Sequence, residues 1–138
     1  MSRLRVLLCD DEPQMLSWLQ SVLEPEHTVI GTAWDGRALI NTALALRPDL
    51  ILTELDLPIL NGLDTVQELR LALPECRIIF HTSRSEPEMI AAAFAAGAAG
   101  YLIKGEARSL RHSILSVITE VHDHHVKFVT DRSAHHMF

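Results

Sequence analysis

Polar side chains able to do chemistry follow directly after four short apolar runs of the sequence. They are, in chain order, Asp10, Asp11, Glu54, Asp56, Thr82, Ser83 and Lys104. Oxygen ligands of this kind suit Mg²⁺, and a carboxylate beside Mg²⁺, a hydroxyl and a lysine ammonium is an arrangement for phosphoryl transfer. Crowded carboxylates also raise one another's pKa values, so either a divalent metal or the lysine must compensate their charge. We therefore expect one acidic site with a cation at its centre.

Apolar runs and helical patterns alternate along most of the chain and indicate how these residues are positioned. The apolar runs predict strands at residues 4–9, 27–34, 50–53, 77–81 and 100–103. Amphipathic patterns bounded by proline, acidic residues or glycine predict helices at residues 14–23, 36–47, 63–73, 86–97 and 109–121. Five such units imply an α/β fold with a doubly wound, all-parallel sheet. The carboxyl ends of parallel strands meet at one edge, so the polar residues should converge there.

Each of these polar residues also has a purely structural interpretation. Asp10 and Asp11 are suited to capping a helix, Thr82 to closing a turn, and Lys104 to a solvated surface. Their joint position at the ends of predicted strands favours a shared site. A small flavodoxin-like cofactor binder is disfavoured, because no glycine-rich phosphate loop follows the first strand.

The length and net charge of the chain limit the classes of function that it can have. The chain has 138 residues, which is the size of one domain, and its 18 acidic against 12 basic residues give a net charge of −6. Such a surface disfavours direct nucleic-acid binding by this chain. The two cysteines are too few for a disulfide scaffold, and no apolar stretch is long enough for a membrane span. We expect a cytoplasmic protein without membrane contact.

Four blocks of the sequence resemble the receiver domain of response regulators: residues 6–13, 48–62, 82–83 and 100–104. The resemblance implies a flavodoxin-like (βα)₅ fold with strand order 2-1-3-4-5 and a role as a signalling switch in two-component systems. It also implies Mg²⁺ as a cofactor and a histidine kinase as a partner. In the implied site, Asp10, Asp11 and the backbone carbonyl of Asp56 bind the metal, position 54 is the phosphoacceptor, Thr82 and Lys104 assist, and Tyr101 is the switch aromatic.

The acceptor position departs from the family pattern. The family's acceptor aspartate precedes the loop proline by four residues and the loop glycine by eight, and both counts, from Pro58 and Gly62, arrive at Glu54. One interpretation is that Glu54 imitates a phosphoaspartate and draws Thr82 and Tyr101 towards an active-like state. Another is that it forms an ion pair with Lys104 and leaves an inert site. Both predict an atypical, non-enzymatic receiver that works without aspartyl phosphorylation. The alternative is a functional Mg²⁺-dependent phosphoacceptor that uses Glu54 or Asp56.

The residues after Lys104 are similar to those of NarL/LuxR-type regulators, whose output domain is a helix-turn-helix. This resemblance implies a receiver at residues 1–121 and, at residues 122–138, a histidine-rich tail or linker towards an output domain absent from this chain. It also implies a homodimer that acts in transcription control. The tail histidines lack a metal-ligand spacing, so a solvated tail is favoured over a metal site.

Overall fold

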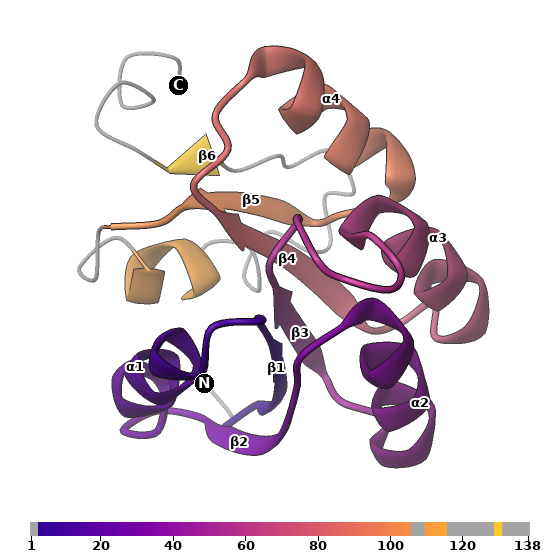
Figure 1. The fold of residues 1–138 in the computed structure, drawn as a ribbon. Coiled ribbons are helices and arrows are strands. Elements are labelled where there is room, and N and C mark those ends of the chain that lie inside the picture. Colours follow the sequence, from indigo (N-terminus) through magenta and orange to yellow (C-terminus); the bar gives the residue numbers. More distant parts are fainter. Residues whose placement is uncertain (1–2, 106–109, 116–128, 131–138) are drawn as a thin grey trace.

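Strands and helices alternate along the chain as the sequence predicts (Figure 1). A computed structural model describes residues 3–105, 110–115 and 129–130. Residues 110–115 are helical and belong to the predicted fifth helix, whose remainder lies outside the described residues. The other predicted elements match the observed ones to within one residue at each end. The observed elements are β1 (Arg5–Cys9), α1 (Pro13–Leu23), β2 (Thr28–Ala33), α2 (Gly36–Leu46), β3 (Leu50–Thr53), α3 (Gly62–Ala72), β4 (Arg77–Thr82), α4 (Pro87–Ala96), β5 (Gly100–Ile103) and β6 (Val129–Thr130).

The strands form one parallel sheet in the order β2-β1-β3-β4-β5-β6. The predicted order 2-1-3-4-5 and the flavodoxin-like receiver fold are therefore confirmed. The strand β6 is an addition: it pairs in parallel with Tyr101 and Leu102 of β5. It lies in the segment expected to be a tail or linker, and two residues are too few to leave a periodic signal in the sequence.

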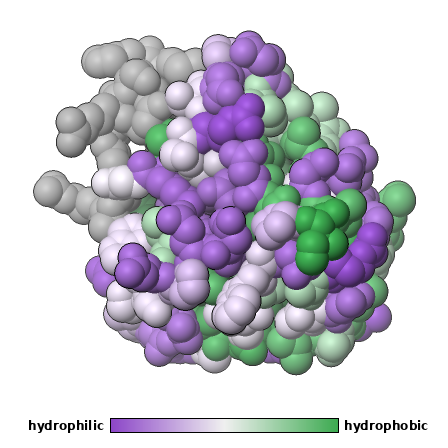
Figure 2. All heavy atoms as spheres, viewed as in Figure 1, coloured by the Kyte–Doolittle hydropathy of each residue, from purple (hydrophilic) through white to green (hydrophobic). Residues whose placement is uncertain are grey.

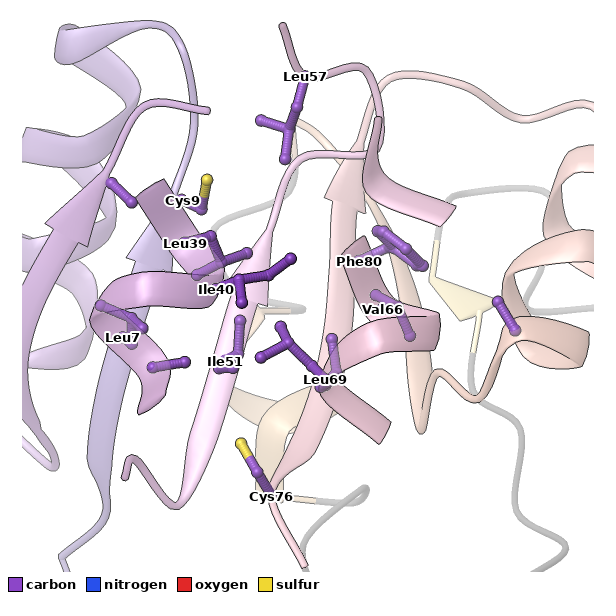
Figure 3. Close-up of a cluster of buried hydrophobic side chains, with 14 of the residues drawn as sticks. Leu7, Cys9, Leu39, Ile40, Ile51, Leu57, Val66, Leu69, Cys76 and Phe80 are labelled. Carbon is purple, nitrogen blue, oxygen red and sulfur yellow. The ribbon is translucent and has the colours of Figure 1, made fainter. Parts of the chain in front are cut away.

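Side chains alternate along each central strand between two apolar cores, one on each face of the sheet. Leu7 and Cys9 of β1 enter the first core, which the helices α2, α3 and α4 cover (Figure 3). Val6 and Leu8 enter the second core, which α1 and the helical residues 110–115 cover. Figure 1 shows these two groups of helices on opposite sides of the sheet. Burial on both faces accounts for the continuous apolar runs in the sequence.

Local signals in the sequence set the ends of the helices. Asp35 caps α2, because its carboxylate accepts a hydrogen bond from the backbone N–H of Ala38 at 2.7 Å. Gly97 ends α4 in a left-handed conformation, with φ 116°. At the start of α2 the backbone passes very close to the loop after β3: a Cβ on Gly36 would lie 2.1 Å from the carbonyl oxygen of Leu60. The backbone N–H of Gly36 also donates to the carbonyl of Pro58 at 3.4 Å, so the start of α2 packs directly against the loop that follows β3.

Within the described residues, no helix is both long and apolar enough to cross a membrane.

Candidate functional site

The carboxyl ends of β1, β3, β4 and β5 carry the predicted site residues to one edge of the sheet. Strand pairing continues up to the site itself: the backbone N–H of Glu54 donates to the carbonyl of Cys9 at 2.9 Å, and that of Lys104 donates to the carbonyl of Thr82 at 2.9 Å. Hydrophilic side chains gather in the middle of the face in Figure 2, over the loops that follow β3 and β4. The positions of Asp10, Glu54, Thr82 and Lys104 thus follow from the parallel sheet.

The ammonium of Lys104 lies at the centre of the site. Its Nζ is 2.8 Å from Glu54 Oε1, 3.0 Å from Asp10 Oδ2 and 3.4 Å from Glu12 Oε1. Only 12% of the lysine side chain is exposed. Burial alone would lower the pKa of Lys104, but the carboxylates of Glu54 and Asp10 raise it above its ordinary value. Lys104 is therefore charged and supplies the cation that the clustered carboxylates require.

The carboxylate of Glu54 is engaged at both of its oxygen atoms. Oε1 faces Lys104, and Oε2 accepts hydrogen bonds from the backbone N–H groups of Leu55 and, at 2.9 Å, Asp56. The nearby hydroxyl of Thr82 also acts to lower the pKa of Glu54. Burial by itself raises the pKa of Glu54, but these partners outweigh it and leave the pKa below its ordinary value. Glu54 is thus ionised, and the ion pair with Lys104 that one interpretation of the sequence anticipated is present.

Asp10 occupies a different environment beside the same ammonium. Its side chain is 1% exposed, and Oδ1 accepts a hydrogen bond from the backbone N–H of Glu12 at 2.9 Å. Burial raises the pKa of Asp10 above its ordinary value, although the Glu12 amide and Lys104 both act to lower it. The two carboxylates that share Lys104 therefore differ, since the pKa of Glu54 is lowered and that of Asp10 is raised.

Asp11 and Asp56 were also expected at a metal site, Asp56 through its backbone carbonyl, and neither side chain contacts Lys104. Asp11 is exposed, and Asp56 directs Oδ1 to the guanidinium of Arg84 at 2.9 Å. In the described part of the chain, no group of three His, Cys, Asp or Glu side chains is arranged to hold a metal ion. The inner carboxylate oxygens already face Lys104, which stands where a cation would bind. In this arrangement Lys104, and not a metal ion, is the counter-charge of Asp10 and Glu54, so Mg²⁺ would bind at these carboxylates only where the contacts with Lys104 open.

Tyr101 is fully buried, and its ring packs at 6.3 Å from that of Phe80. Its hydroxyl donates a hydrogen bond of 2.7 Å to the backbone carbonyl of Arg84 in the loop between β4 and α4. Burial raises the pKa of Tyr101 above its ordinary value, so the phenol remains a donor. The predicted switch residue is thus turned inward and joined to the loop that follows Thr82.

Two residues at the site escaped the sequence analysis. Arg84 is one; it follows Thr82 by two positions, as Asp56 follows Glu54 by two. Arg84 and Asp56 both lie beyond the paired residues of the neighbouring strands β4 and β3, where the loops bring their side chains to 2.9 Å, and no periodic pattern in the sequence marks this contact.

His81 is the other residue that was missed. It lies on the second face of the sheet, where its ring stacks on Trp18 with centroids 6.1 Å apart and an interplanar angle of 18°. Burial, and secondarily the charge of Lys104, lowers the pKa of His81 to about 4. A neutral imidazole therefore underlies the charged site at pH 7.

Comparisons with known proteins agree with this geometry. Residues 6–115 match the family model described as the response regulator receiver domain. The nitrate/nitrite response regulator protein NarL of Escherichia coli (strain K12) is 37% identical over 101 residues, which cover 72% of this chain and 47% of NarL. The transcriptional regulatory protein YxjL of Bacillus subtilis (strain 168) is 33% identical over 104 residues, which cover 74% of this chain and 48% of YxjL.

A solved structure shares both fold and sequence. The REC domain of AraT, a response regulator from Geobacillus stearothermophilus, superposes with a TM-score of 0.77 at 26% identity, covering 89% of this chain and 98% of that one. The chain therefore spans about half the length of the curated relatives above, and nearly the whole of this isolated receiver structure.

Proposed function

The chain belongs to the response regulator receiver domain family, of NarL/LuxR type, and from that premise we propose that it is a receiver whose signalling conformation is set without aspartyl phosphorylation. Glu54 stands at the family's acceptor position, and Lys104 neutralises it from within the chain. The receiver then acts by docking to a partner or to a second copy, and performs no turnover of its own.

One observation carries this proposal: both oxygens of the Glu54 carboxylate are engaged by groups of the chain itself. Lys104 Nζ lies 2.8 Å from Oε1, while two backbone N–H groups, those of Leu55 and Asp56, donate to Oε2. A carboxylate nucleophile needs a free oxygen aligned with the phosphorus, and displacements of about 1 Å are costly for such a reaction. Glu54 also provides, permanently, negative charge in contact with Thr82 and Lys104.

The experiment is phosphorylation by a small donor. The purified chain is incubated with Mg²⁺ and acetyl phosphate, and its intact mass is measured; we expect no adduct. The matched variant Glu54→Asp shortens the side chain by one methylene, which withdraws the carboxylate from Lys104, and we expect it to gain one phosphate. A stoichiometric adduct on Glu54 or Asp56 of the unaltered chain would instead support a Mg²⁺-dependent phosphoacceptor served by a histidine kinase.

We further propose that the chain is the regulatory half of a cytoplasmic transcription regulator that carries a helix-turn-helix output domain and forms a homodimer. The relatives named above support this, since both are regulators of about twice the length of the matched segment. The helical residues 110–115 bear on the dimer surface: Ile114 is buried in the second core, whereas Leu115 is 45% exposed. Multi-angle light scattering of the chain tests dimerisation directly, and a monomer at all concentrations would contradict it.

A further inference from the structure

Arg84 connects four elements that meet at the site. Its guanidinium lies 2.9 Å from Asp56 Oδ1, beyond the end of β3, and 2.8 Å from Glu86 Oε2, at the start of α4. Its backbone N–H donates to the hydroxyl of Thr82 at 3.3 Å, and its carbonyl accepts the Tyr101 hydroxyl at 2.7 Å. A single residue therefore joins the ends of β3 and β4, the ring carried by β5, and the first turn of α4.

These contacts form a continuous connection from the charged site to Tyr101. Glu54 accepts the backbone N–H of Asp56 at 2.9 Å, and the side chain of Asp56 holds Arg84. The carbonyl of Arg84 in turn holds the phenol of Tyr101. The hydroxyl of Thr82 accepts the N–H of Arg84 at 3.3 Å, so the end of β4 is joined to the same loop.

The arrangement around the guanidinium favours a positioning role over a stabilising one. Arg84 and its two carboxylate partners are all partly exposed, with 34%, 59% and 44% of the side chains of Arg84, Asp56 and Glu86 accessible. Ion pairs with that exposure contribute little to folding stability. The planar guanidinium nevertheless meets Glu86 through both Nε and Nη2, a two-point contact that fixes orientation.

We propose that Arg84 is the positioning residue that keeps Tyr101 inward, by tying the loop between β4 and α4 to Asp56. The inference rests on the proposed function. In a receiver whose conformation does not depend on phosphorylation, the ion pair between Arg84 and Asp56 would hold the loop between β4 and α4 against the loop after β3. Arg84 acts on Tyr101 through its own backbone carbonyl, which accepts the hydrogen bond from the Tyr101 hydroxyl. The position of this carbonyl depends on the ion pair that the Arg84 guanidinium forms with Asp56.

Tyr101 is the single tyrosine of the chain, so it reports on its own orientation. The full chain is labelled with 3-fluorotyrosine, which yields one ¹⁹F resonance. We expect a single resonance of a buried ring in the unaltered chain. In Arg84→Ala and in Asp56→Asn we expect a second resonance, shifted towards that of the urea-unfolded chain, with the melting temperature unchanged within about 4 °C. Sodium chloride at about 1 M should produce the same second resonance by screening the pair.

A matched control is available in Arg37, which forms an exposed pair with Glu68 at 3.5 Å between α2 and α3, away from Tyr101. Arg37→Ala should leave the spectrum unchanged. The proposal is overturned if Arg84→Ala and Asp56→Asn both keep the single buried resonance, or if Arg37→Ala changes it equally. The phosphodonor experiment is independent: an unaltered chain that becomes labelled, while Arg84→Ala still shifts the resonance, would refute the proposed function and retain the role of Arg84.

Discussion

Lys104 Nζ lies closer to Glu54 Oε1, at 2.8 Å, than to Asp10 Oδ2, at 3.0 Å, and it contacts both from a position that is almost closed to solvent. The site therefore contains two carboxylates and one ammonium, with Glu12 as a more distant and exposed third acid. Removing the ammonium would leave the two inner carboxylates facing one another without a cation.

We expect Lys104→Met to lower the free energy of unfolding by about 3 kcal/mol, because it strands buried carboxylates. Urea unfolding at pH 7 measures this. The double variant Lys104→Met with Glu54→Gln removes one of the stranded charges and should be more stable than the single Lys104 variant. If the two substitutions instead destabilise additively, Lys104 and Glu54 are not coupled and the electrostatic account of the site is wrong.

The buried imidazole of His81 should make stability depend on pH. Its pKa is about 4 in the folded chain against an ordinary 6.5, so the unfolded chain binds more protons in this interval. Stability should therefore fall as the pH is lowered from 6.5 towards 4, by about 3 kcal/mol at the lower end. The variant His81→Phe keeps a ring against Trp18 and should lose this component. The free energy of unfolding is measured against pH for the unaltered chain and for His81→Phe, and the difference between the two curves separates the contribution of His81 from that of the other histidines. Parallel curves would exclude His81 as the source of the pH dependence.

Gly36 should not tolerate a side chain. A Cβ there would lie 2.1 Å from the carbonyl oxygen of Leu60 and 2.3 Å from Thr65 Oγ1, and the first of these belongs to the backbone. We expect Gly36→Ala to cost about 2 kcal/mol, measured by thermal unfolding. Gly31→Ala is the matched control: its nearest neighbour would be the flexible end of Leu46, at 3.3 Å. Equal losses in both variants would mean that helix or strand preference, and not the close approach, is responsible.

Both thiols should be unreactive in the folded chain. Burial, as the leading cause, raises the pKa of Cys9 and of Cys76 to about 12, so the reactive thiolate is scarce at pH 7. Ellman's reagent should therefore react slowly with the native chain and rapidly with two equivalents of thiol in denaturant. Fast native labelling would show that the first core, which contains both cysteines, opens readily, and the variants Cys9→Ala and Cys76→Ala would identify which cysteine reacts.

The sequence predicted those parts of the molecule that depend on regular patterns. Because strand and helix periodicities were clear, the parallel sheet followed, and with it the meeting of Asp10, Glu54, Thr82 and Lys104. Side-chain direction beyond a strand end was harder to foresee. The sequence resemblance assigned only the backbone carbonyl of Asp56 to the metal, and the partner of its side chain, Arg84, was not foreseen.

Two further features depend on contacts between distant segments. Nothing local marks His81 as the partner of Trp18, since a helix and a strand far apart in the chain bring them together. The pairing of β6 with β5 likewise depends on where the chain returns to the sheet. The local hydrophobic patterns of the sequence therefore predict neither the contact between His81 and Trp18 nor the pairing of β6 with β5.

The pairing of β6 alongside Tyr101 and Leu102 has a consequence for self-association. An unpaired strand edge is a template on which another chain can add a strand, and β6 occupies part of that template on β5. At the opposite end of the described sheet, β2 presents its outer edge. There the pairing with β1 is irregular between Val6 and Leu7, and such irregularities hinder the docking of a foreign strand. The described sheet thus ends on one side in a strand of only two residues and on the other in a strand of irregular register, and both features make a poor template for open-ended strand addition.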